Sequence, residues 1–173
     1  MEKVEMNKDI KLSEHLASPS EAALSHLSEL NGLRLSPHFS LGELTKTNYV
    51  TKDGNFPSRV AIENLTNICE NWLEALRQAQ GPLIINSGYR SPEVNKLAGG
   101  APTSNHLTGC AVDIHVSGFE QAIRYASILL DISEGTQRDY DELFIEKNKT
   151  GSHWIHFAVK PKDNRRKLGF IKV

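Results

Sequence analysis

Two short blocks of this chain combine histidine and carboxylate side chains at a spacing that suits metal chemistry. Residues 104–113 read Ser-Asn-His-Leu-Thr-Gly-Cys-Ala-Val-Asp, which places Asp113 seven positions after His106. Residues 153–156 read His-Trp-Ile-His and supply His156 near the C-terminus. Two imidazoles and one carboxylate are a ligand set of catalytic zinc sites, in which a fourth position stays open for water. These residues predict a metal centre and a hydrolytic reaction.

The elements around the first block are expected to turn its two ligands toward one point. His106 lies in a loop rich in small residues, and Gly109 allows the chain to turn before a strand expected over residues 110–116. Alternate residues of a strand point to opposite faces, so Asp113 is expected on the face away from the core. His115 shares that face, and we interpret it as a supporting or surface histidine rather than a ligand.

The second block is expected on a strand over residues 153–159, after a strand over residues 140–146 and a polar hairpin loop. Its apolar residues alternate with Trp154 and His156, which therefore share the face away from the core. A histidine beside a tryptophan on such a face suits the lining of a cleft, so Trp154 is a candidate for substrate contact.

Composition and charge are those of an ordinary globular domain. Hydrophobic residues make up 39% and charged residues 24% of the 173 residues, and the formal net charge is −1. That charge gives no indication of a nucleic-acid partner, and no apolar run approaches the length of a membrane span. The first residues lack the apolar core of a signal peptide, so synthesis in the cytoplasm is expected. Cys69 and Cys110 lie in apolar contexts and are predicted to be buried free thiols.

The order of the predicted elements indicates an α+β fold with a small antiparallel sheet packed by helices. Residues 1–35 are expected to form a polar arm and a short docking helix, and residues 36–173 a single catalytic domain. Capping residues and apolar periodicity predict the main elements. The helices are expected over 57–79, 91–97 and 119–130, and the strands over 83–86, 110–116, 140–146 and 153–159.

Several motifs together resemble the zinc D-Ala-D-Ala carboxypeptidase family, peptidase family M15, and within it the small single-domain branch found in phages and gut bacteria. The resemblance spans about 120 residues and implies the α+β fold and hedgehog-like zinc site of that family. The residues that carry it are Phe39–Leu44, Ile85–Ser91, Ser104–Asp113, Tyr140–Glu146 and Trp154–His156.

The resemblance also implies roles for individual residues. His106, Asp113 and His156 would be the zinc ligands. Arg90 would polarise the scissile carbonyl, and its fixed guanidinium donors suit a developing oxyanion. Ser104 would position the substrate. A surface ion pair is the alternative for Arg90, and a turn-shaping role is the alternative for Ser104.

The general base is the point at which the chain departs from the family pattern. Many members carry a carboxylate three residues before the last histidine ligand, where this chain has His153. The segment that ends in Glu146 resembles the strand that brings a glutamate to the zinc site in the hedgehog-like branch. We therefore predict Glu146 as the base, with His153 as a second candidate or a transition-state stabiliser. An exposed carboxylate at the hairpin end is the alternative for Glu146.

These features predict a zinc peptidase that hydrolyses a peptide bond in bacterial cell-wall peptide, with peptidoglycan as its partner. Both a terminal D-Ala-D-Ala bond and an internal L-Ala-D-Glu type bond stay open, as does the oligomeric state. A wall-binding or virion structural module that kept the zinc site without catalysis is one alternative. A non-haem iron enzyme is another, because two histidines and a carboxylate also bind Fe(II).

Overall fold

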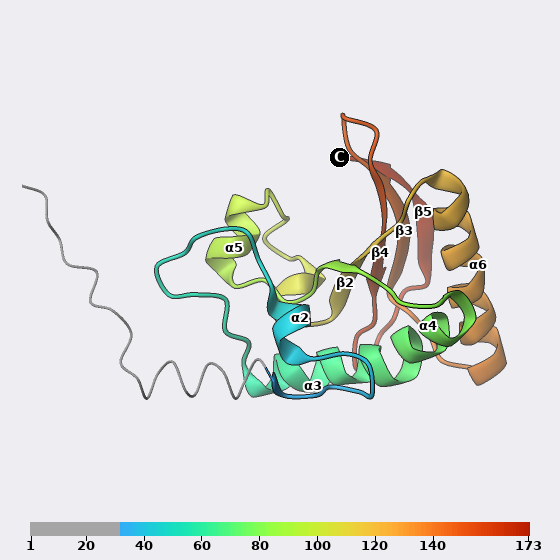
Figure 1. Ribbon diagram of the computed structural model, residues 1–173, viewed down its shortest axis with the longest axis horizontal. Helices are drawn as coiled ribbons and strands as arrows, with labels where there is room; N and C mark the ends of the chain where they lie inside the picture. The colour runs from blue at the N-terminus through green and yellow to red at the C-terminus, as the bar shows by residue number, and fades with distance from the viewer. Residues whose placement is uncertain (1–31) are drawn as a thin grey trace, which may run out of the picture.

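A computed structural model describes residues 32–173 and shows a five-stranded sheet packed by helices (Figure 1). The predicted α+β class is confirmed. The helix expected within residues 1–35 lies outside the described residues. In the described part of the chain, no helix combines the length and apolar character that crossing a membrane requires.

The long predicted helix forms, but it contains a wider turn in its middle. It consists of α3 (Arg59–Ile68), the π-helical turn η1 (Cys69–Leu73) and α4 (Glu74–Gln80). Ser58 begins it by accepting a hydrogen bond from the backbone of Ala61 at 3.2 Å. Within η1 the ring of Trp72 packs on Phe157 of the sheet, with centroids 5.0 Å apart. The wide turn thus adds a large aromatic contact between the helix and the core.

The shorter helices have serine caps, and the one expected over 91–97 begins where the sequence predicts. Ser40 caps α2 (Leu41–Thr45), and Ser91 caps α5 (Pro92–Leu97). The last helix, α6 (Phe119–Thr136), runs six residues beyond its predicted end because its inner face continues through Ile132, which packs against the core, to the buried Ser133. A 3₁₀ turn, η2 (Asn105–Thr108), carries the first histidine block.

The sheet is mixed, whereas the sequence predicted an antiparallel one. Its order is β1-β2-β4-β3-β5, and every neighbouring pair except the last is antiparallel. Residues 159–166 leave β4 beside the start of β3 and cross that end of the sheet, so β5 runs parallel to β3. The strands are β1 (Ile85–Ser87), β2 (Ala111–His115), β3 (Glu142–Lys147), β4 (His153–Ala158) and β5 (Lys167–Lys172).

The two faces of the sheet have different chemistry. On the face covered by α6, strands β2, β3 and β4 contribute the fully or almost fully buried apolar side chains Val112, Ile114, Leu143, Ile145, Ile155 and Phe157. On the opposite face, the register places Asp113, His156 and Phe144 side by side across three strands. The loops around α5 and η2 lie toward this second face (Figure 1). Both cysteines are free and buried, as predicted.

Candidate metal centre and active site

His106, Asp113 and His156 come together in the structure although 50 positions of sequence separate the two histidines. One ligand-type atom from each lies within 4.8 Å of the others. The Oδ1 atom of Asp113 is 3.2 Å from Nε2 of His106 and 3.0 Å from Nδ1 of His156. Two imidazole nitrogens and a carboxylate oxygen thus converge on one point, which is a donor set that zinc accepts.

The η2 turn and one backbone carbonyl orient His106. Ser104 begins the turn by accepting a hydrogen bond from the His106 backbone at 3.3 Å. Gly109 ends it in the left-handed conformation, with φ of 70°. The Nδ1 atom of His106 lies 2.6 Å from the carbonyl oxygen of Gly88. An Nδ1–H donated to this carbonyl leaves Nε2 unprotonated and facing Asp113, as a metal ligand requires.

Sheet register places the other two ligands. Asp113 on β2 and His156 on β4 are direct antiparallel partners, so their side chains emerge together on the same face. Burial alone would raise the pKa of Asp113, but the charge of His106 and hydrogen bonds with both histidines hold that pKa well below its usual range. Burial would lower the pKa of His156, but the hydrogen bonds with Asp113 and Glu142 raise it to about 9.

Arg90 lies against the ligand cluster and is not a surface charge. Its Nη2 donates to Oδ2 of Asp113, and its Nε donates to Oγ of Ser87 at 2.8 Å. Its backbone N–H donates to the carbonyl of His106 at 3.1 Å. The side chain is only 16% exposed, so its planar head is fixed by these bonds beside the site.

A cavity of about 250 Å³ opens beside His156. Glu146 and Ser104, both predicted site residues, line it together with Phe144, whose ring stacks on His156 with centroids 6.0 Å apart. Glu146 is half-buried, and this burial raises its pKa. A carboxyl group with a raised pKa in a cleft suits proton transfer near neutral pH. The remaining lining residues are Ala101, Thr103, Asn105, Glu142, Arg165 and Ile171.

Trp154 stands next to Glu146 in the sheet, where it pairs with Glu146 on one side and His115 on the other. Its indole contributes a hydrogen bond to the Glu146 carboxyl, which counteracts part of the rise in the pKa of that group. Trp154 therefore shares the site face but supports Glu146 rather than lining the cavity. His115, on the same row, is exposed.

The structure does not bring His153 into the site, which corrects the prediction that placed it there. His153 precedes His156 by an odd number of positions on the same strand, so its side chain emerges on the opposite face. Its ring packs against Phe119 of α6, with centroids 5.6 Å apart. The strand alternation that placed His156 also predicts this position of His153. His153 lies two positions before the core residue Ile155 and therefore points to the same face.

Sequence reasoning missed a network of charged residues behind His156. The carboxylate of Glu142 lies 3.4 Å from Nε2 of His156, and Arg165 binds both Glu142 and the fully buried Asp141. Two basic residues that follow β4, Lys160 and Arg165, both bind Asp141. Strand alternation could have identified Glu142, because it lies four positions before Glu146 on β3 and points to the same face.

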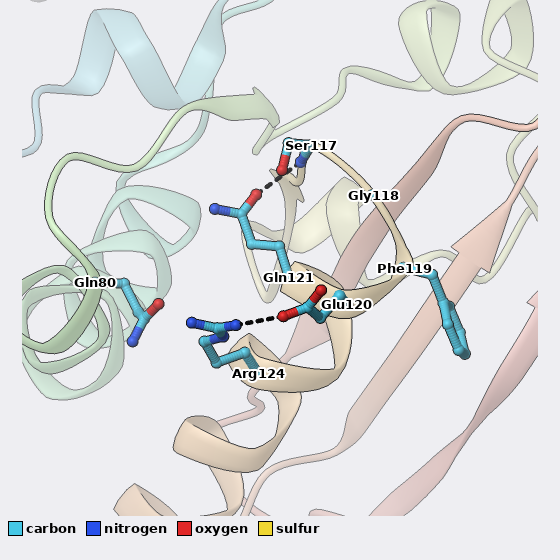
Figure 2. A pocket seen from close by; sticks show the side chains of 7 residues that line it. All are labelled: Gln80, Ser117, Gly118, Phe119, Glu120, Gln121 and Arg124. Carbon is cyan, nitrogen blue, oxygen red and sulfur yellow. Dashed lines mark hydrogen bonds and ion pairs between the residues drawn. The ribbon is translucent and has the colours of Figure 1, made fainter.

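A second hollow lies at the start of α6, away from the metal ligands (Figure 2). Its polar side chains pair with near neighbours. The Nη2 atom of Arg124 is 2.6 Å from Oε1 of Glu120, and the backbone N–H of Ser117 donates to Oε1 of Gln121 at 2.6 Å. The two charged side chains that line this hollow, Glu120 and Arg124, are therefore paired with each other.

Comparison with known proteins agrees with this geometry. The sequence model of the family described as Peptidase M15 matches residues 37–141, more than half of the chain. The chain belongs to the peptidase M15 family. Within the matched stretch lie Arg90, His106 and Asp113, whereas Glu146 and His156 follow it. The placement of those two residues beside the matched ones therefore rests on the geometry of the sheet.

A curated M15-type relative is the zinc D-Ala-D-Ala carboxypeptidase of Streptomyces albus G. It is 34% identical to this chain over 80 residues, which are 44% of this chain and 31% of the relative. The chain thus matches about a third of the length of that protein. The donor set of two histidines and an aspartate agrees with the metal in the relative's name.

Proposed function

We propose that this M15 family member is a zinc peptidase that hydrolyses a peptide bond in bacterial cell-wall peptide. The observation that carries the proposal is the convergence of His106, Asp113 and His156 beside a cavity that also contains a half-buried carboxyl group. The name of the Streptomyces relative supports a D-Ala-D-Ala bond as one substrate. An internal L-Ala-D-Glu type bond is the other candidate, and the bacterial wall is the place of action in both cases.

His106, Asp113 and His156 would hold the zinc ion, with Nε2 of the first and Nδ1 of the last facing the carboxylate. A zinc ion in such a site supplies a Lewis acid and lowers the pKa of a water molecule to about 7. The chain itself must then bind the substrate, move a proton and stabilise the developing negative charge.

Glu146 is the proposed general base. It takes the proton from the attacking water and passes it to the leaving amine, for which its raised pKa is suited. Strand alternation supports Glu146 over His153, because the side chain of His153 emerges on the opposite face, whereas Glu146 lines the cavity with His156. The indole of Trp154 would hold the carboxyl group in place.

Arg90 is the proposed oxyanion stabiliser. Its hydrogen bonds with Asp113 and Ser87 fix the guanidinium in a defined orientation at the ligand cluster. Ser104 combines two roles in the proposal, since it caps the turn that carries His106 and lines the cavity in which the substrate backbone would lie. Turn capping is its structural role, and substrate positioning is the proposed one.

The test is digestion of purified peptidoglycan by the zinc-loaded protein, with the released products identified by mass spectrometry. Loss of a terminal D-Ala would support the carboxypeptidase activity, and fragments that begin at D-Glu would support the endopeptidase. A zinc-loaded, folded protein that binds peptidoglycan and releases nothing would reject the enzyme and favour the wall-binding module. Iron in place of zinc in the purified protein would favour the non-haem iron enzyme.

A further inference from the structure

Both nitrogens of the His156 ring face a carboxylate. Its Nδ1 is 3.0 Å from Oδ1 of Asp113, on the side where the three proposed ligands converge. Its Nε2 points the other way and lies 3.4 Å from Oε2 of Glu142. The ring therefore has an inner nitrogen directed at the metal site and an outer nitrogen directed at a second acidic residue.

The outer nitrogen of His106 is arranged in the same manner, because its Nδ1 lies 2.6 Å from the carbonyl of Gly88. A histidine that binds a metal usually donates its other ring N–H to a carbonyl or carboxylate, which selects the tautomer and orients the ring. Gly88 supplies that acceptor for His106. Among the described contacts of His156, the carboxylate of Glu142 is the acceptor in the corresponding position.

Glu142 is itself held in place from two other segments. Arg165 donates from Nη2 to Oε1 at 2.6 Å, and Asn105 donates from Nδ2 to Oε2 at 3.0 Å. The Glu142 side chain is 18% exposed. Asn105 directly precedes His106, and its amide also reaches Asp141 at 3.0 Å. The same small network thus fixes the environments of both ligand histidines.

The sheet register explains why Glu142 and Glu146 serve different purposes. Phe144 pairs with His156, and the two glutamates flank Phe144 on the same face. Both glutamates line the cavity, but Glu142 pairs with Ala158 and contacts the outer nitrogen of His156, whereas Glu146 pairs with Trp154 on the other side of Phe144. One carboxylate is therefore placed to orient the ligand and the other to act on the substrate.

We propose that Glu142 is a positioning residue of the metal centre, whose carboxylate accepts the Nε2–H of His156 and so presents Nδ1 to the zinc ion. The inference rests on the proposed zinc site. It assigns a role to a residue that follows the stretch matched by the family, which ends at Asp141. Arg165 and Asn105 assist by holding the carboxylate in that orientation.

The experiment measures zinc affinity by competition with a chelator, with Zn²⁺ alone and no substrate. Glu142→Ala should weaken zinc binding by about 10- to 100-fold, the usual effect of removing such a partner. Glu142→Gln keeps a carbonyl acceptor of the same shape and should lose less. Glu120→Ala, which removes an exposed carboxylate paired with Arg124 on α6, is the matched control and should bind zinc as the unchanged protein does.

A second readout separates positioning from general loosening. Nitrogen-15 NMR of the zinc-loaded protein should show His156 protonated at Nε2 in the unchanged chain, and the outer-nitrogen signal should shift or broaden in Glu142→Ala while that of His106 stays. Unchanged zinc affinity and an unchanged His156 signal in folded Glu142→Ala would overturn the inference. If that variant does not fold, the same two measurements are made on Glu142→Met, whose side chain has a similar length but offers no oxygen acceptor, and wild-type values there would overturn the inference.

The result is separable from that of the proposed function. Zinc binding that depends on Glu142, in a protein that releases no wall fragments, would support this inference and reject the peptidase. Failure of the unchanged protein to bind zinc would overturn both.

Discussion

Asp113 is the residue on which the candidate site converges. Its Oδ1 faces both ligand histidines, and its Oδ2 accepts from Arg90. Two histidines and an arginine compensate a single carboxylate, which explains why it can stay ionised at 7% exposure. The groups that would do chemistry, Glu146 and Arg90, lie around this centre without belonging to the ligand set.

At the residue scale, Glu146→Gln should keep zinc bound but lower hydrolysis of peptidoglycan by about 10²- to 10⁴-fold, since an amide cannot accept the proton. His153→Ala is the control, because its ring packs on Phe119 on the far face of β4. It should retain nearly full activity. Initial rates and zinc content of both variants check this. An active Glu146→Gln together with an inactive His153→Ala would reverse the roles.

Arg90→Ala should fold and lose at least about 100-fold in kcat, the typical effect of removing an oxyanion donor. Arg90→Lys should be impaired as well, since an ammonium cannot reproduce the simultaneous bonds to Asp113 and Ser87. Steady-state kinetics together with circular dichroism would test both variants. A wild-type kcat in folded Arg90→Ala would show that the arginine serves only to balance the charge of Asp113.

At the element scale, the site depends on close contacts between backbone segments. The loop after β1 lies directly on α2, where Tyr89 donates to the carbonyl of Leu44 at 2.8 Å. Gly88 supplies the carbonyl that orients His106, and a Cβ at that position would lie 2.2 Å from the Leu44 oxygen. A helix of five residues therefore determines where the ligand-orienting carbonyl can lie.

Gly88→Ala should accordingly destabilise the fold by about 1–3 kcal/mol, because backbone must shift to admit the methyl group, and it should weaken zinc binding through His106. Gly135→Ala is the matched control. Nothing lies within 4 Å of the new Cβ in α6, so this change should stabilise by about 0.5–1 kcal/mol. Urea denaturation and chelator competition measure the two effects. Equal behaviour of both variants would show that the contact with α2 is unimportant.

The connection from β4 to β5 is anchored by a buried charge. Asp141 has no exposed side-chain surface and binds Arg165, Lys160 and Asn105. Burial would raise its pKa, but these hydrogen bonds hold the pKa well below its usual range. Since the folded pKa is lower than the unfolded value of about 3.9, this carboxylate stabilises the fold above about pH 4 and the contribution is lost as the pH falls.

Asp141→Asn should therefore reduce the free energy of unfolding by about 3–5 kcal/mol at pH 7, the effect of breaking a buried pair. The difference in the free energy of unfolding between this variant and the unchanged protein should narrow by about 1 kcal/mol at pH 3. At that pH the carboxyl group of Asp141 is already protonated in the unfolded chain. Asp139→Asn, at an exposed partner of Arg166, should change stability by less than about 1 kcal/mol. Urea titrations at the two pH values decide. An equal loss in the free energy of unfolding at pH 7 and pH 3 would contradict the lowered pKa of Asp141.

At the scale of the whole molecule, the candidate metal would link a turn and two strands that lie far apart in the sequence. His106 belongs to the η2 turn, Asp113 to β2 and His156 to β4. Binding of an ion to all three favours the folded chain over the unfolded chain, in which these ligands are far apart. Stability should therefore depend on metal.

We expect one zinc ion per chain and an unfolding temperature that rises by about 5–10 °C when free zinc reaches about 100 times its dissociation constant. His106→Ala, Asp113→Ala and His156→Ala should each remove stoichiometric zinc and this rise. Elemental analysis and thermal denaturation with and without chelator measure both quantities. Full zinc occupancy in all three variants would reject the ligand assignment.

The sequence by itself determined the features that depend on short-range rules. Capping residues and apolar periodicity located the helices, and strand alternation placed Asp113 and His156 on the face away from the core. Strand alternation also places His153 on the opposite face from His156, but the prediction of His153 as a site residue did not use this. Family resemblance supplied the expected roles of the ligand residues and Arg90 before any geometry was known.

Only the tertiary structure decided which groups meet across long stretches of chain. Asp113 and His156 are 43 positions apart, Arg165 and Asp141 are 24 apart, and the pairing of each depends on sheet order and register. The parallel direction of β5 followed from the path of residues 159–166, where no local pattern specifies an orientation. The tautomer-setting contacts of Gly88 and Glu142 arise the same way, because a hydrogen-bond partner is chosen by proximity in the folded chain and not by spacing along it.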